Sequence, residues 1–94
     1  MLVPTVDVKQ FERYGFRRCK GIYGKDGCYY LCIAKGIKML FVSKLMFAIN
    51  PWNEGDPRIH KHPNCRYTDK RDAYDIMYLL IKDGLLKSEW EGRI

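Results

Sequence analysis

Between residues 51 and 67 the chain gathers side chains that bind metals, act as nucleophiles or anchor protein interfaces, in the run PWNEGDPRIHKHPNCRY. Its prolines and its glycine are incompatible with a continuous helix or strand. Irregular segments longer than about 12 to 15 residues in a compact domain are usually functional or disordered. Because Trp52, Ile59 and Tyr67 are unlike a disordered linker, we expect this segment, the 51–67 loop, to be ordered and functional.

A metal or thiol site in this loop would depend on His60, His62 and Cys65, which form H-x-H-x-x-C. Two extended histidines two residues apart can point the same way, but tetrahedral zinc needs a fourth ligand that the sequence does not identify. Cys65 beside either histidine could act as a nucleophile. No glycine-framed nucleophile motif and no orienting acid accompany it. We therefore expect no metal, no cofactor and no enzymatic activity, and we keep a thiol or zinc site as the third interpretation.

Other candidate ligands have simpler explanations. Cys28 and Cys32 on one strand would lie about 13 Å apart, too far to share a zinc ion. Together with Cys19 they are predicted to be small apolar thiols in a core. Glu54 and Asp56 are predicted to form turns rather than a catalytic carboxylate pair.

The loop instead resembles a protein-binding surface, because Trp, Tyr and Arg dominate interface energetics. The predicted partner-binding residues are Trp52, Arg58, His60, His62, Arg66 and Tyr67.

A second candidate surface is basic. Between residues 13 and 38 the only acidic residue is Asp26, whereas the basic residues are Arg13, Arg17, Arg18, Lys20, Lys25, Lys35 and Lys38. The interleaved tyrosines are Tyr14, Tyr23, Tyr29 and Tyr30. Such a surface could bind phosphates with its cations and stack bases on its rings, although basic residues also protect exposed strand edges from pairing. The predicted nucleic-acid-binding residues are Arg17, Arg18, Lys20, Lys25, Lys38, Lys70 and Arg71.

Local patterns predict the elements that hold these surfaces. Asp7 and Gln10 resemble a capping box for a helix over residues 8–14 that Gly15 ends. The runs FRRCKGIY and CYYLCIAK flank residues 24–27 and predict a β-hairpin. A tight turn at Lys35 and Gly36 leads to a third strand, IKMLFVS, and residues 45–50 extend it or form a short fourth element.

After the loop, Thr68 or Asp69 is predicted to cap a helix that carries an apolar stripe and stops at Gly84. The stripe consists of Ala73, Ile76, Met77 and Leu80. Leu85, Leu86 and Trp90 are then predicted to dock on the sheet or to form a last short strand.

Alternation along the strands predicts two apolar sheet faces. One face has Cys19, Tyr30, Cys32, Ala34, Ile37, Met39 and Phe41, and we expect a helix to cover it. The other has Ile22, Tyr29, Leu31, Ile33, Leu40 and Val42. Either the helices and the tail cover both faces, or one face is an interface with a partner or a second copy.

The whole chain, residues 1–94, is predicted to be one small α+β domain. Its three- to four-stranded antiparallel sheet packs with a short N-terminal helix and a C-terminal helix, in the order α-β-β-β-loop-α. The net charge of +6 favours anionic partners. Without a membrane span or a signal peptide, we expect a cytoplasmic protein with reduced cysteines, either a monomer or a homodimer.

The order α-β-β-β-α resembles the double-stranded-RNA-binding domain, whose second helix begins with a basic cluster as Lys70 and Arg71 do here. The loop motif and the Lys-rich, Ala-rich second helix of that family are missing from DAYDIMYLLIKDG, so its activity is not carried over.

The run FERYGFRRCKGIYGKDGCYYLCIAKGIKMLFVS, then Trp52, DPRIHKHPNCRY and LIKDGLL, is similar to small uncharacterised accessory proteins of bacteriophages and prophages. This resemblance implies a non-enzymatic role in a bacterial cytoplasm, where such proteins often inhibit host defence machinery, including CRISPR effectors. The first hypothesis is therefore an anti-defence protein of the anti-CRISPR kind that blocks a host protein or nucleoprotein through the loop and the basic aromatic surface. The alternative is direct binding of nucleic acid or a nucleotide.

Overall fold

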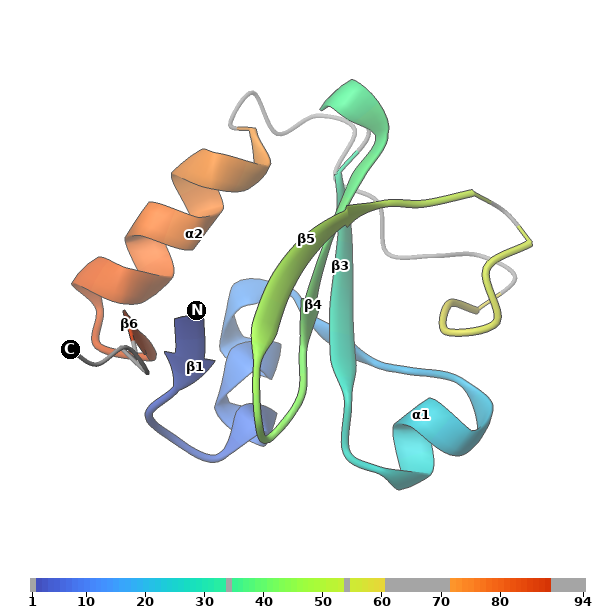
Figure 1. Ribbon diagram of the computed structural model, residues 1–94, viewed down its shortest axis with the longest axis horizontal. Coiled ribbons are helices and arrows are strands. Elements are labelled where there is room, and N and C mark those ends of the chain that lie inside the picture. The colour runs from blue at the N-terminus through green and yellow to red at the C-terminus, as the bar shows by residue number, and fades with distance from the viewer. Residues whose placement is uncertain (1, 34, 54, 61–71, 89–94) are drawn as a thin grey trace, which may run out of the picture.

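The computed structural model describes residues 2–33, 35–53, 55–60 and 72–88, and shows a small α+β domain built on a six-stranded antiparallel sheet (Figure 1). The strands are β1 (Leu2–Pro4), β2 (Arg17–Arg18), β3 (Tyr29–Ile33), β4 (Lys38–Val42), β5 (Phe47–Pro51) and β6 (Leu86–Ser88), in the spatial order β2-β3-β4-β5-β1-β6. The helices are η1 (Val8–Tyr14), α1 (Gly21–Lys25), η2 (Lys35–Ile37) and α2 (Ala73–Lys82). The predicted fold class is confirmed, but the predicted order and strand number are too simple.

The centre of the sheet is the meander β3-β4-β5. Tyr29 pairs with Val42 at one end of the β3–β4 ladder and Ile33 pairs with Lys38 at the other. The short connection between them is η2, in which Gly36 has a φ of 73°, as the predicted turn requires. The predicted second and third strands are confirmed, and residues 47–51 form a fourth strand along β4.

The predicted hairpin around residues 24–27 is confirmed only in its antiparallel pairing, of Arg17 with Tyr30 and of Arg18 with Tyr29, whereas its tight turn is wrong. β2 is only two residues long, and the chain then forms the helical turn α1 before it enters β3. A Cβ atom at Gly24 would lie 2.1 Å from the carbonyl oxygen of Cys19, so only glycine allows this turn to pack so closely on the end of β2. The Cys28 N–H donates to the backbone carbonyl oxygen of Tyr23 at 3.0 Å and closes the turn. Backbone contacts within residues 19–28 thus replace the rest of the expected ladder.

The two predicted helices are present, with differences at their caps. The first is a 3-10 helix over the predicted residues, where the Asp7 carboxylate accepts from the Lys9 N–H at 3.0 Å and Gly15 is left-handed. The second begins later than expected. Its cap is Asp72, which forms a capping box with Asp75. Thr68 and Asp69, the predicted caps, lie outside the described residues.

Two short strands complete the sheet. β6 confirms the prediction of a last strand, with Trp90 outside the described residues. β1 was not predicted, because three residues are too few for a periodic pattern. It pairs with β6 along its length and with β5 at Leu2 and Phe47, so it joins the two ends of the chain.

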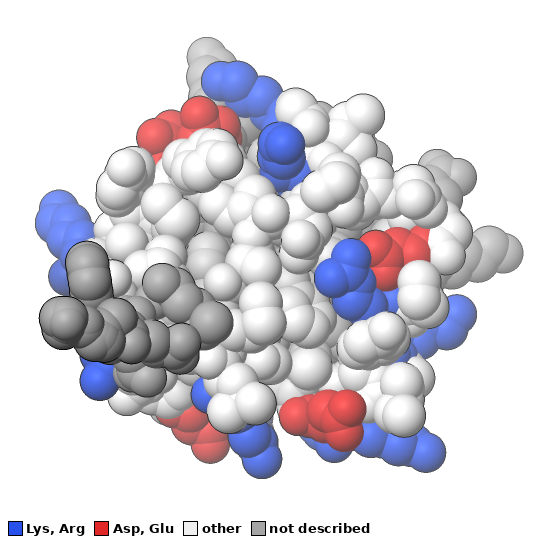
Figure 2. Space-filling view, viewed as in Figure 1, with Lys and Arg blue, Asp and Glu red and all other residues white. Residues whose placement is uncertain are grey.

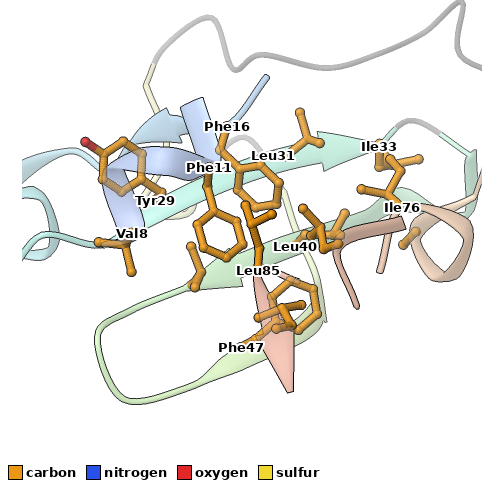
Figure 3. Close-up of a cluster of buried hydrophobic side chains, with 14 residues drawn as sticks. Val8, Phe11, Phe16, Tyr29, Leu31, Ile33, Leu40, Phe47, Ile76 and Leu85 are labelled. Carbon is orange, nitrogen blue, oxygen red and sulfur yellow. The ribbon is translucent and has the colours of Figure 1, made fainter. Parts of the chain in front are cut away.

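The sheet has two buried faces that differ in what covers them. The helix face carries alternate residues of β3 and β4, under η1 and α2 (Figure 3). Its sheet residues are Tyr29, Leu31, Ile33, Leu40, Val42 and Phe47. The opposite surface, the loop face, consists of Cys19, Cys28, Tyr30, Cys32, Met39 and Phe41, with Ile59 packed on it. Figure 1 shows α2 and the chain around residue 59 on opposite sides of the sheet.

The predicted division of strand residues between faces is confirmed, but the expected covering is reversed. The helices pack on the face of Tyr29, and the face of Tyr30 is closed by part of the 51–67 loop. Ile22 and Ile37, each predicted to lie on one of the two apolar sheet faces, are 67% and 57% exposed because they lie in α1 and η2 rather than in strands. Ala34 lies outside the described residues.

Candidate functional site

The described part of the 51–67 loop folds back onto the sheet. We call residues 52, 53 and 55–60 the cover segment. Ile59 is 3% exposed within the loop-face cluster, and the Trp52 Nε1–H donates to the Ile33 carbonyl oxygen at 3.4 Å. The Lys20 N–H donates to the Arg58 carbonyl oxygen at 2.9 Å and ties the segment to the chain beyond β2. This segment is therefore part of the core closure.

Arg58 is held within the segment by Asp56. Its Nη2 and Nε donate to the two carboxylate oxygens of Asp56 at 2.7 and 3.0 Å, and its guanidinium lies 5.2 Å from the centre of the Phe41 ring. The side chains of Arg58 and Asp56 are 21% and 9% exposed. The hydrogen bonds from Arg58 lower the pKa of the Asp56 carboxyl. Arg58 thus fixes the segment on Phe41.

His60 makes the second polar attachment. The Tyr30 hydroxyl lies 2.9 Å from His60 Nδ1, and the His60 N–H donates to the same hydroxyl at 3.2 Å. Burial lowers the pKa of His60, and the charges of Arg17 and Lys20 lower it further. Both effects favour the neutral form of the ring. A neutral Nδ1 can accept the hydroxyl proton of Tyr30 while that oxygen accepts from the backbone.

These contacts revise the expected binding surface. Trp52, Arg58 and His60 contact the sheet and are partly buried, so they stabilise the fold before any partner arrives. His62, Cys65, Arg66 and Tyr67 lie outside the described residues, and the predictions that rest on them stay predictions. Burial raises the pKa of Cys19 to about 12 and also raises that of Cys28, which makes these thiols poor nucleophiles.

A concave basic surface lies where η1, β2, α1 and the β4–β5 connection meet. This basic hollow has a volume of about 240 Å³. Its lining residues are Asp7, Val8, Lys9, Arg18, Lys25, Asp26, Gly27, Tyr29 and Lys44. The four cations come from four separate segments, so the hollow exists only in the folded chain.

Local packing positions two of these cations. Arg18 Nε donates to the Gly24 carbonyl oxygen at 2.8 Å, which directs the guanidinium along α1. Lys44 Cε lies 3.8 Å from the position that a Cβ atom would take at Gly27, so its stem crosses the bare backbone of that glycine. Within the described residues, the one ion pair joins Arg58 and Asp56. Lys9, Arg18, Lys25 and Lys44 thus form no salt bridge with another described residue, although Asp7 and Asp26 line the same hollow and offset part of their charge.

The predicted nucleic-acid-binding residues divide into three groups. Arg18 and Lys25 line the hollow, and Arg17 and Lys20 are exposed near the same edge strand. Lys38 pairs at the opposite end of β4, away from the Tyr29–Val42 end. Lys70 and Arg71 lie outside the described residues. Lys9 and Lys44 were missed, because they lie just outside the basic run of residues 13–38 and nothing in their spacing links them to it.

The tyrosines are less available for stacking than the sequence suggests. Tyr29 and Tyr30 are 4% and 0% exposed. Tyr29 donates its hydroxyl proton to a Glu12 carboxylate oxygen at 2.9 Å, and burial and this carboxylate raise its pKa. The Tyr14 hydroxyl donates a hydrogen bond to the Asp83 carboxylate at 2.7 Å. Tyr23, on α1, keeps 37% of its surface exposed and can stack on a ligand.

The basic hollow adjoins an apolar one of about 420 Å³. Its lining residues are Asp26, Cys28, Ser43, Lys44 and Leu45, and it shares Asp26 and Lys44 with the basic hollow. Leu45 is 81% exposed. Figure 2 shows one face of the molecule, with a largely uncharged centre and with Lys, Arg, Asp and Glu mainly toward its margin.

Comparison of the chain with protein-family models, curated proteins and solved structures found no match. In the part of the chain that the structure describes, no helix has the length and apolar character needed to cross a membrane. The functional conclusion therefore rests on the geometry of the site alone.

Proposed function

We propose that this chain is a non-enzymatic binding protein that contacts phosphate groups of a nucleic acid or nucleoprotein through the basic hollow. The observation that carries the proposal is the convergence of Lys9, Arg18, Lys25 and Lys44 from four segments without a salt bridge among the described residues. Exposed cations that form no salt bridge in the free protein contribute most to the binding free energy of a phosphate. Charge-assisted hydrogen bonds to phosphate are about twice as strong as neutral ones.

The size of the hollow favours one chemical group of a larger ligand. Pockets that enclose a whole small molecule usually have volumes of roughly 300 to 1,000 Å³, whereas the basic hollow has about 240 Å³. A phosphate presented by a polymer fits this description. The exposed Arg17 and Lys20 lie toward the loop face, where their charges act on His60, so a polymer would have to pass around the edge strand β2 to reach them.

Fluorescence-anisotropy titration of nuclease-treated protein with short DNA and RNA, at two salt concentrations, tests the proposal. We expect binding that weakens steeply with salt, because phosphate contacts release counterions. Arg18→Glu with Lys25→Glu should abolish it. Lys35→Glu with Lys82→Glu changes the net charge equally at exposed sites outside the hollow and should leave most of the affinity. No binding at either salt would contradict the proposal.

The same surface supports a specific version of the inhibitor hypothesis. We propose that the protein blocks a host nucleoprotein, such as a CRISPR effector, by occupying its nucleic acid and an adjacent protein surface. Ile22 favours a protein contact, because it is apolar and 67% exposed on α1, whose Lys25 lines the basic hollow. Retention of a partner from bacterial lysate that survives nuclease but is lost in Ile22→Ser would support this version. Retention that disappears with nuclease alone would reduce the function to nucleic-acid binding.

A further inference from the structure

We propose that the basic hollow and the adjoining apolar hollow form one site for a nucleoside phosphomonoester, such as the phosphorylated end of a nucleic acid strand. The phosphate lies among Lys9, Arg18, Lys25 and Lys44, and the terminal base lies against Cys28 and Leu45. This inference rests on the proposed function and narrows it from phosphates in general to a phosphate at a chain end.

The two hollows are continuous through shared side chains. Asp26 and Lys44 line both, so a ligand that fills one lies directly against the other. Leu45 follows Lys44 in the β4–β5 connection, and Cys28 follows Gly27 directly before β3. In these two segments, a residue that lines the basic hollow is therefore followed by one that lines the apolar hollow.

Charge favours a terminal phosphate over an internal one. The four cations and the two carboxylates of Asp7 and Asp26 leave the basic hollow with a net charge of +2. A phosphomonoester carries a charge of about −1.5 to −2 at pH 7, whereas an internal diester carries one negative charge. The terminal group thus matches the hollow, and it can enter end-on because only one substituent leaves the phosphate.

The second hollow suits the base or ribose rather than another phosphate. Leu45 and Cys28 offer apolar contacts to a ring, and Leu45 is 81% exposed, so a bound ring would remove apolar surface from water. The Asp26 carboxylate can accept hydrogen bonds from a ribose hydroxyl or a base amino group. In this hollow Asp26 and Lys44 leave no net charge, so it lacks the net attraction that the basic hollow offers to a phosphate.

Affinities for matched oligonucleotides test the inference. One labelled strand is prepared with a 5′-phosphate, with a 3′-phosphate and with hydroxyls at both ends, and a nucleoside monophosphate serves as competitor. We expect one phosphorylated form to bind at least tenfold more tightly than the hydroxyl form. Effective competition by the monophosphate would identify a free nucleotide as a sufficient ligand, whereas failure to compete would identify the strand end.

Two exposed substitutions separate the parts of the site. Lys44→Ala should remove most of the preference for the phosphorylated end, and Leu45→Ser should weaken binding of a strand with a terminal base but not of one with an abasic end. Lys35→Ala, outside both hollows, is the matched control. Equal binding of phosphorylated and hydroxyl strands would overturn this inference but leave the proposed function intact. Absence of binding by every strand would overturn both.

Discussion

The two faces of the sheet are closed by different kinds of structure. On the helix face, η1 and α2 cover aliphatic and aromatic side chains through apolar packing. On the loop face, an irregular segment covers thiols, Met39 and Tyr30, and specific polar contacts of Arg58 and His60 attach it. The helix face depends on apolar area, whereas the cover segment combines the burial of Ile59 and Trp52 with a few polar contacts. The loop face should therefore open more easily than the helix face.

The largest effects should come from the core, and neighbouring residues of β4 compare the faces directly. Leu40 and Met39 are both 0% exposed, on the helix face and the loop face respectively. Leu40→Ala should cost near the upper end, and Met39→Ala near the lower end, of the roughly 2 to 5 kcal/mol range for such truncations. An irregular cover can collapse into the cavity better than a packed helix. Urea denaturation measures both, and equal losses would remove the distinction between the faces.

Gly24→Ala should be the next most damaging change. The new Cβ atom would meet the Cys19 carbonyl oxygen, so α1 must shift, at a cost of about 1 to 3 kcal/mol typical of overpacking. The shift also removes the carbonyl that holds Arg18, so oligonucleotide affinity should fall as well. Gly55→Ala, where the nearest atom would be 3.3 Å away, is the control. A variant as stable as the parent would show that α1 is not tightly packed.

Arg58→Ala should open the cover segment selectively. It removes both side-chain hydrogen bonds to the mostly buried Asp56, and hydrogen bonds to charged groups are worth about 1.5 to 3 kcal/mol. Trp52 fluorescence, measured with Trp90→Phe as background, should shift to the red as the ring becomes solvated. Arg13→Ala, on the exposed surface of η1, is the control and should leave the Trp52 emission spectrum unchanged. An unshifted spectrum would mean that apolar contacts alone hold the segment.

The smallest effect should be a pH dependence of the loop face. The folded-state pKa of His60 is below its ordinary value near 6.5, so the unfolded chain takes up a proton first as the pH falls. The contribution of neutral His60 to the free energy of unfolding is complete above the unfolded-state pKa. As the pH falls below that pKa the contribution is lost progressively, until His60 is protonated in the folded state too. Denaturation midpoints between pH 5 and 8 measure this step, and His60→Gln should remove it. If the step persisted in that variant, another group would be responsible.

Sequence reasoning succeeded where the signal was local. Alternation placed Tyr29 and Tyr30 on opposite faces, and Asp7 and Gly15 marked the ends of η1. It failed for α1, because a hairpin turn and a helical turn both accept the glycines around residues 24–27, and the contact between Gly24 and Cys19 decides between them. The partner-binding prediction for Trp52 and Arg58 stays a prediction, and their packing on the sheet could not be foreseen, because composition does not show whether a loop packs on its own sheet.

The sequence by itself determined the fold class, the apolar strands and the faces on which their residues lie, since backbone geometry repeats every two residues in a strand. Only the tertiary structure decided which cover closes each face and which cations converge. Lys9, Arg18, Lys25 and Lys44 line one hollow because four segments meet at one end of the β3–β4 ladder. No spacing along the chain encodes that meeting, which depends on contacts between residues far apart in sequence.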